Sequence, residues 1–125
     1  DERPQVASVF VNRLRQGMKL QTDPTVIYGV TRGQGVLGRG LRQSELRGAT
    51  PWNTNVIDDL PPTPTANPGR AAIEATLNPD ETPYIFFVAV GTGGHGFSVT
   101  PAEHNANVAK WRAIEAERAR SQQGN

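Results

Sequence analysis

The sequence predicts an α+β fold: a single compact domain in which helices surround a small antiparallel hairpin. Three observations lead to this prediction. Apolar residues recur at helical spacing near both ends of the chain and between them, and a β-rich apolar run is followed, after a glycine loop, by a second one. The length of 125 residues allows one modest core, and the hydrophobic content of 36% is low but within the globular range.

The first predicted helix starts at the N-terminus. Pro4 suits its first turn, because a first-turn residue has no use for the N–H that proline lacks. Val6, Val9 and Leu14 follow at helical spacing, and Gly17 ends the helix.

The middle of the chain is predicted to hold one short helix between loops. Asp23 and Pro24 have the pattern of an N-cap followed by proline at the first helical position, and apolar residues continue the helix to Tyr28. Segment 31–40 is glycine-rich and is expected to be a flexible loop before one helical turn over 44–46. The proline-rich segment 53–69 is expected to be extended and rigid.

A further helix and the hairpin are predicted after Gly69. Asn67 and Pro68 are expected to cap a helix that ends before Pro79. Its apolar face is predicted to comprise Ala72, Ile73, Thr76 and Leu77. The segments 84–90 and 97–99 are apolar and β-rich, so they are expected to pair across the glycines between them.

The last helix has a clear start signal. Thr100, Pro101 and Glu103 match a capping box with proline at the first helical position, and Val108, Trp111 and Ile114 are expected to face inward. From residue 115 the sequence is charged and small, so we expect it to fray. The predicted domain therefore covers residues 1–112, and residues 113–125 form a charged helix end or tail.

Composition excludes several functions. A net charge of +1, from 13 basic and 12 acidic side chains, argues against nucleic acid as a partner. The chain has no cysteine, so it has neither a disulfide nor a zinc–thiolate site. The two histidines lack a third ligand at useful spacing, so no metal site is expected. No apolar run is long enough to span a bilayer, so any membrane anchor must lie outside this chain.

Residues 91–96 match a dinucleotide-binding motif literally, yet the context argues against it. This motif requires a helix after its glycines, whereas residues 97–99 are strand-like, so a hairpin loop is favoured. His95 within this loop either contacts a ligand or is a solvated, locally bonded side chain.

Polar side chains in two loops are the candidate ligand site. Asp23 fits both a helix cap and a ligand contact. Trp52 fits either a core role or a flat apolar surface for a sugar ring, with Asn53 and Thr54 beside it as polar partners.

The chain resembles the YceG-like family of endolytic murein transglycosylases from its first residue to about Trp111, with the motifs in order. The residues that carry the resemblance are Glu2-Arg3-Pro4, Val6-Ala7-Ser8-Val9-Phe10, Asn12-Arg13-Leu14, Met18, Leu20-Gln21-Thr22-Asp23-Pro24-Thr25-Val26-Ile27-Tyr28-Gly29, Asn53-Thr54, Leu60-Pro61-Pro62, Asn67-Pro68-Gly69, Phe87-Val88-Ala89, Gly93-Gly94-His95 and His104-Asn105. The chain departs from the family pattern at Trp52, Asn55, Asp59, Thr63 and Thr65.

The resemblance implies a bacterial enzyme whose catalytic domain lies in the periplasm, anchored in the inner membrane by an N-terminal helix absent from this chain. Its expected substrate is the peptidoglycan glycan strand, cleaved without a cofactor, and the cell-wall synthesis machinery is a candidate partner. The family's catalytic glutamate is expected shortly upstream of Asp1, and Glu2 is the weaker candidate within the chain. The residues expected to line the glycan cleft are Gln21, Thr22, Asp23, Tyr28, Asn53, Thr54, Asn67 and His95.

Two other functions remain open at this point. A module that binds peptidoglycan without cleaving it would have the same polar loops. Family members have also been labelled aminodeoxychorismate lyase, a pyridoxal-phosphate enzyme. That chemistry requires a Schiff-base lysine, and only Lys19 and Lys110 are available.

Overall fold

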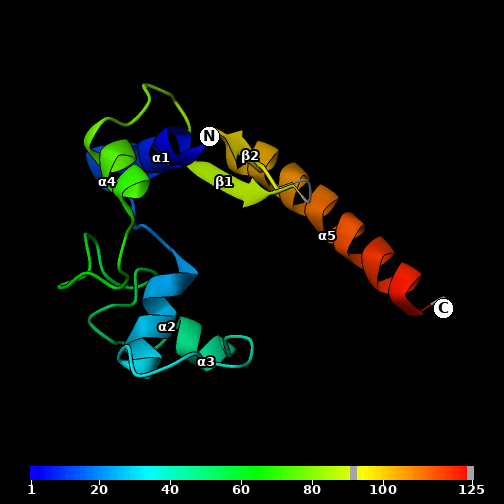
Figure 1. Cartoon of the computed structure of the whole chain (residues 1–125), viewed down its shortest axis with the longest axis horizontal. Helices are drawn as coiled ribbons and strands as arrows, with labels where there is room; N and C mark the ends of the chain where they lie inside the picture. Colours follow the sequence, from blue (N-terminus) through cyan, green and yellow to red (C-terminus); the bar gives the residue numbers. More distant parts are fainter. Residues whose placement is uncertain (91–92, 124–125) are drawn as a thin grey trace. The chain divides into compact units, whose positions relative to one another are not determined.

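The computed structural model describes residues 1–90 and 93–123, which include five helices and two strands (Figure 1). These elements are α1 (Arg3–Arg15), α2 (Asp23–Thr31), α3 (Gln43–Leu46), α4 (Arg70–Leu77), β1 (Phe86–Ala89), β2 (His95–Ser98) and α5 (Pro101–Gln123). The α+β prediction is confirmed. Gly91 and Thr92 of the literal dinucleotide motif lie outside the described residues.

The chain divides into two compact units. Unit 1 comprises Asp1–Asn12 and Ala71–Asn125, and unit 2 comprises Arg13–Arg70. The predicted boundary after residue 112 concerns a functional domain and stays a prediction.

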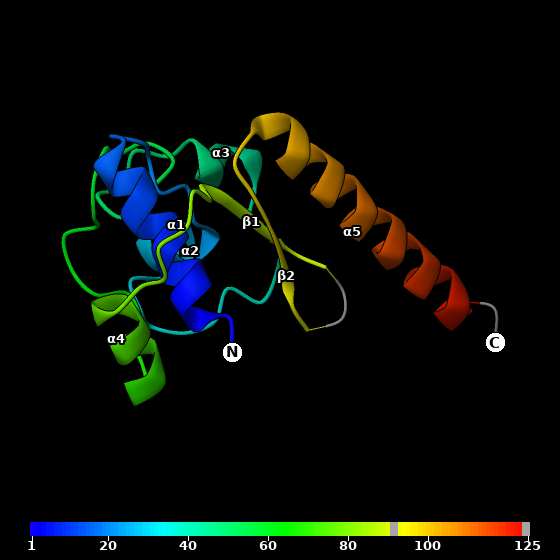
Figure 2. The same ribbon diagram turned by 90° about the horizontal axis from the view of Figure 1, so that it is seen from above.

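The hairpin of unit 1 has the predicted antiparallel form. Phe86 pairs with Ser98 at one end and Ala89 pairs with His95 at the other. Helix α5 packs against both strands, as Figure 2 shows. His95 is therefore the first residue of a strand, and the expectation that it lies within a turn is wrong.

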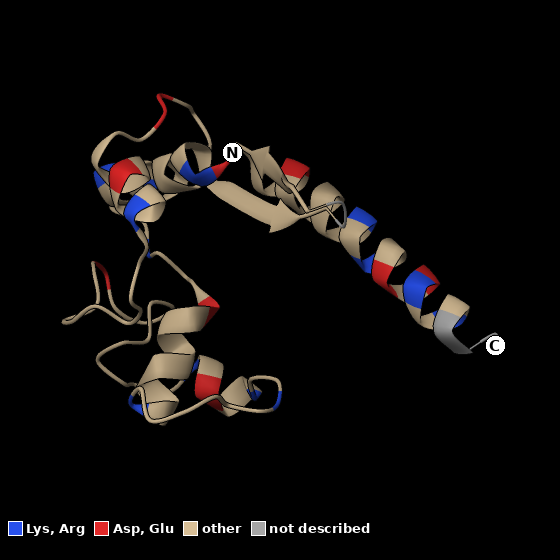
Figure 3. Ribbon diagram, viewed as in Figure 1, with Lys and Arg blue, Asp and Glu red and all other residues tan. Residues whose placement is uncertain are grey.

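Helix α5 begins as predicted and continues further than predicted. The Thr100 hydroxyl accepts a hydrogen bond from the Glu103 N–H (3.2 Å) and donates one to the Glu103 carboxylate (3.1 Å). The helix extends to Gln123, so the expected fraying from Glu115 is wrong. Alanine, glutamate and arginine are strong helix formers. Residues of both charges are distributed along the distal part of α5 (Figure 3).

Hydrogen bonds tie α1 to the segment between α4 and β1. The Ser8 hydroxyl bonds the Thr82 hydroxyl (2.7 Å). The Asn12 amide donates to the carbonyls of Thr82 (2.7 Å) and Tyr84 (2.9 Å). On the same helix, the Phe10 ring meets the Phe87 ring edge to face at 5.8 Å. These contacts fix α1 against the hairpin within unit 1.

The predicted apolar face of α4 is wrong. Ile73 and Leu77 are 47% and 74% exposed, whereas Ala75 is buried. The helix also begins at Arg70, so Asn67 and Pro68 precede it rather than cap it. The buried residue of α4 is thus a small one.

Helices α2 and α3 contact each other in unit 2. The N-cap of α2 is Thr22, whose backbone is extended, so Asp23 is the first helical residue and not the predicted cap. Before α3, Arg39 forms a two-point ion pair with Glu45 (2.7 and 2.9 Å). The hydrogen bonds from Arg39 are the main cause that lowers the pKa of Glu45 to about 2.

Candidate functional site

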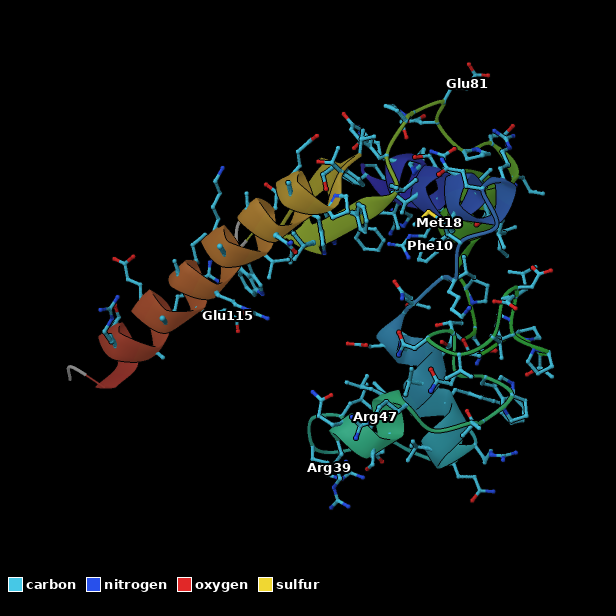
Figure 4. All side chains as sticks on the ribbon, turned by 180° about the vertical axis from the view of Figure 1, so that it is seen from behind. Phe10, Met18, Arg39, Arg47, Glu81 and Glu115 are labelled. Carbon is cyan, nitrogen blue, oxygen red and sulfur yellow. The ribbon has the colours of Figure 1, made fainter. Side chains whose placement is uncertain are left out.

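A cleft of about 700 Å³ lies within unit 1. This volume is in the range of small-molecule sites. Residues of α1, α4 and the start of β2 surround it, together with the N-terminal residues and Gly93. The lining residues are Asp1, Glu2, Arg3, Val6, Ala7, Phe10, Ala72, Ala75, Thr76, Gly93 and His95. Phe10 is labelled on α1 in Figure 4.

A contact between Glu2 and His95 joins two polar residues of this cleft. Glu2 Oε2 lies 2.8 Å from His95 Nδ1, and Glu2 Oε1 accepts the backbone N–H of His95 at 3.3 Å. Both carboxylate oxygens therefore contact one residue, and the two side chains are 38% and 34% exposed. The contact joins the start of α1 to the start of β2.

Two glycines shape the backbone beside this contact. Gly93 has a φ of +89°, a conformation that other residues rarely adopt. A β-carbon on Gly94 would lie 2.8 Å from Glu2 Oε1. Gly94 is therefore needed because it leaves room for the carboxylate, and Gly93 because of its dihedral angle.

The hydrogen bond from the His95 side chain lowers the pKa of Glu2. A general acid needs a raised pKa, so that it still carries its proton near neutral pH. The environment of Glu2 thus favours a carboxylate that accepts hydrogen bonds, and it does not favour a proton donor.

The other predicted site residues lie in unit 2, where Asn53 and Thr54 are fully buried at 0% exposure. The Asn53 amide donates to the carbonyls of Leu46 (3.2 Å) and Gly48 (2.6 Å), and its oxygen accepts the Asn55 N–H (2.9 Å). Asn53 thus holds the loop together, and it offers no group to a ligand in this structure.

Thr54 fastens the same loop to the start of α2. Its hydroxyl accepts the Thr22 N–H at 2.8 Å and lies 2.8 Å from the Thr25 hydroxyl, and its carbonyl accepts the Gln21 N–H at 3.1 Å. The structure therefore brings Gln21, Thr22 and Thr54 together. These residues are held together by the hydrogen bonds that join the two loops.

Gln21 and Asp23 remain exposed beside these loops. Gln21 has a φ of +50°, which is uncommon for a residue other than glycine. Its side-chain oxygen lies 3.4 Å from a nitrogen of the buried Arg13 guanidinium. Gln21 and Asp23 therefore keep polar groups at the surface beside the start of α2.

Tyr28 and Trp52 form an aromatic pair in unit 2, with ring centroids 5.4 Å apart. The Arg32 guanidinium lies 4.5 Å from the centroid of the Trp52 ring, and the indole N–H donates to the Thr63 hydroxyl at 2.9 Å. The indole is thus largely engaged by its own chain. Asn67 is exposed in the segment before α4 and does not line the cleft of unit 1.

The family of the chain follows from comparison with known proteins. The model of the YceG-like family matches residues 1–110. The chain belongs to the YceG-like family. A protein of Bacillus subtilis (strain 168) named endolytic murein transglycosylase is 40% identical over 104 residues, which are 83% of this chain and 28% of that protein.

Another similar protein has the same name. The endolytic murein transglycosylase of Streptococcus pneumoniae serotype 2 (strain D39 / NCTC 7466) is 31% identical over 116 residues, which are 88% of this chain and 20% of that protein. The chain therefore spans less than a third of the length of these relatives.

A solved structure has the same fold. The putative yceG-like protein of Listeria monocytogenes is 40% identical, with a TM-score of 0.76 over 85% of this chain and 34% of that one. The YceG-like fold predicted from the sequence is confirmed.

Two negative findings concern the described residues. Among residues 1–90 and 93–123, no helix has the length and apolar character needed to cross a membrane. Within the same ranges, His, Asp and Glu side chains do not gather in a group that could hold a metal ion.

Proposed function

We propose that this chain is part of the catalytic domain of an endolytic murein transglycosylase, and that the cleft of unit 1 holds a peptidoglycan glycan strand. One observation supports this most directly. All residues that line the cleft lie within the family match, and they come from the N-terminal residues, α1, α4, Gly93 and the start of β2. Apolar side chains and a few polar groups line it, as is typical of sugar-sized sites.

The proposed reaction breaks the bond between N-acetylmuramic acid and N-acetylglucosamine without adding water. A carboxylic acid protonates the glycosidic oxygen, which leaves as the N-acetylglucosamine hydroxyl. The C6 hydroxyl oxygen of N-acetylmuramic acid then bonds to C1, and its proton passes to the carboxylate. A 1,6-anhydro ring results and the acid is regenerated, so one carboxyl group suffices where a hydrolase uses two.

We further propose that this acid is a glutamate encoded shortly before Asp1, as the resemblance implies. Within the described lining of the cleft, the carboxyl groups belong to Asp1 and Glu2. Glu2 is a poor proton donor because the contact with His95 lowers its pKa. By the same resemblance, we propose an inner-membrane protein with this domain in the periplasm.

A glycan-binding module without catalysis is the second candidate function, because the cleft and its polar groups would serve it equally well. A pyridoxal-phosphate enzyme has less support. The Lys19 ammonium lies 2.6 Å from the Asp58 carboxylate, and Lys110 is exposed on α5. Neither lysine lines the cleft, so neither has the setting of a Schiff-base residue.

The test uses the full-length protein encoded around this chain and isolated glycan strands, with 1,6-anhydro ends measured by mass spectrometry. We expect the upstream Glu→Gln variant to abolish these ends while its melting temperature stays unchanged. Glu81→Gln is the matched control, since Glu81 is exposed on the loop between α4 and β1 (Figure 4). Glu2→Gln should lower turnover without abolishing it.

Three results would contradict the proposal in different ways. Full turnover in the upstream variant would reject that glutamate as the acid. Complete loss in Glu2→Gln alone, with the fold intact, would assign the acid to Glu2. Binding of strands without any anhydro product from the unmodified protein would favour the glycan-binding module.

A further inference from the structure

The contact between Glu2 and His95 fixes which imidazole nitrogen carries the proton. A carboxylate only accepts hydrogen bonds, so a neutral His95 must carry its hydrogen on Nδ1, which lies 2.8 Å from Glu2 Oε2. Nε2 is then left with a lone pair and acts as an acceptor. Glu2 therefore determines the chemical character of a nitrogen that it does not touch.

The surroundings of the ring hold it in this orientation. The Phe87 ring meets the imidazole edge-on at 5.5 Å. The second carboxylate oxygen binds the backbone N–H of His95, so the carboxylate cannot turn away without losing both bonds. No described residue forms a hydrogen bond with Nε2, and His95 lines the cleft. Nε2 is therefore available to a group bound there.

We propose that His95 accepts, through Nε2, a hydrogen bond from a hydroxyl group of an amino-sugar glycan in the cleft, and that Glu2 is the positioning residue that sets the imidazole for this contact. The identity of the ligand as a glycan rests on the proposed function. The cleft supplies suitable neighbours, because Val6, Ala7 and Phe10 offer apolar surface to a sugar ring.

Two substitutions of His95 separate the two nitrogens. In His95→Asn, the shorter amide reaches the position of Nδ1 and can still donate to Glu2, but nothing replaces Nε2. In His95→Gln, the longer amide reaches the position of Nε2 and can restore an acceptor there. A purely structural role predicts that Asn is the better replacement, whereas our proposal predicts that Gln is better for glycan binding.

The variant Glu2→Gln tests the positioning role. Its single side-chain oxygen is needed by the backbone N–H of His95, so its NH₂ group faces Nδ1. Nδ1 must then accept, and the hydrogen moves to Nε2, which becomes a donor. We expect the fold to be kept while Nε2 changes from an acceptor to a donor.

The experiment combines imidazole ¹⁵N NMR with titration of the full 125-residue chain by a tetrasaccharide of alternating N-acetylglucosamine and N-acetylmuramic acid. We expect the Nδ1–H form in the unmodified chain and the Nε2–H form in Glu2→Gln. Tetrasaccharide binding should weaken about 5- to 10-fold in His95→Asn, as for one hydrogen bond, and less in His95→Gln. Melting curves establish that each variant is folded.

The possible failures are distinguishable. An Nε2–H form in the unmodified chain, or equal binding by His95→Asn, would overturn the inference and leave the proposed function intact. If His95→Asn does not fold, Glu2→Gln decides, and unchanged binding in that variant rejects the positioning role. Absence of tetrasaccharide binding by the unmodified chain would overturn the glycan contact together with the proposed function, whatever the tautomer.

Discussion

Replacing Asn53 by alanine should destabilise unit 2 strongly and leave the glycan affinity of the folded protein unchanged. The substitution removes the donor that satisfies the carbonyls of Leu46 and Gly48 and the acceptor of the Asn55 N–H. These groups surround a side chain with 0% exposure, so water does not replace the lost bonds without disturbing the loop.

The magnitude follows from the shortest contacts. The bonds to the Gly48 carbonyl and from the Asn55 N–H measure 2.6 and 2.9 Å. Leaving a buried polar group unsatisfied costs about 1–3 kcal/mol. A carbonyl keeps a second lone pair and the loop relaxes in part, so we expect a loss of about 2–4 kcal/mol in the free energy of unfolding.

Urea unfolding followed by tryptophan fluorescence measures this loss. In a Trp111→Phe background Trp52 is the remaining tryptophan, and it lies in unit 2 with Asn53. The matched control is Asn67→Ala, because Asn67 is exposed and should change stability by less than about 0.5 kcal/mol. A loss below about 1 kcal/mol in Asn53→Ala, or weaker glycan binding by the folded variant, would refute the structural role.

Three further substitutions test separate contacts. Gly94→Ala should push the Glu2 carboxylate away from His95 and so raise the pKa of Glu2 toward its ordinary value. A ¹³C NMR titration of the carboxyl carbon measures this pKa. An unchanged pKa would mean that the loop absorbs the methyl group. Gly29→Ala should lower the free energy of unfolding by about 1–3 kcal/mol, because the new β-carbon meets the Thr50 side chain. This loss should be smaller in a Thr50→Ala background, and an equal loss in both backgrounds would exclude this contact as the cause. The pKa of Glu45 in the folded state, about 2, lies below its ordinary value of 4.5, so its ion pair stabilises the fold above about pH 4.5 and loses this effect as pH falls toward 2. The melting temperatures of the unmodified protein and Glu45→Gln should therefore converge over that range, and a difference that persists at pH 2 would contradict the assignment.

The sequence was sufficient for elements whose signals are local. The hairpin follows from two β-rich runs with glycines between them, and the start of α5 follows from its capping residues. The face of α4 could not be predicted in the same way. The small residue Ala75 is buried, whereas the larger Ile73 and Leu77 are exposed, and the spacing of apolar residues does not show which of them the rest of the chain covers.

The candidate site was only partly predictable for a related reason. Polar residues in loops serve ligands or bind the backbone of neighbouring loops, and composition does not distinguish the two. Asn53 and Thr54 proved to be buried, and their side chains form hydrogen bonds that hold loop segments together. His95 was predicted as a site residue from its loop alone, but its pairing with Glu2 joins positions 93 residues apart, and no local pattern encodes such a contact.

The order of the two units along the chain determines when the cleft can form. Unit 2 is one continuous segment, whereas unit 1 combines the first twelve residues with the segment from Ala71 onward. During synthesis, unit 2 can complete its own contacts once Arg70 has emerged, because domains fold as units from the N-terminal side. The contact between Glu2 and His95 can form only after His95 has been synthesised, and bringing the two residues together costs the entropy of closing the intervening chain. The cleft therefore forms only after unit 2 has been made, and a chain that stops before His95 lacks the contact between Glu2 and His95.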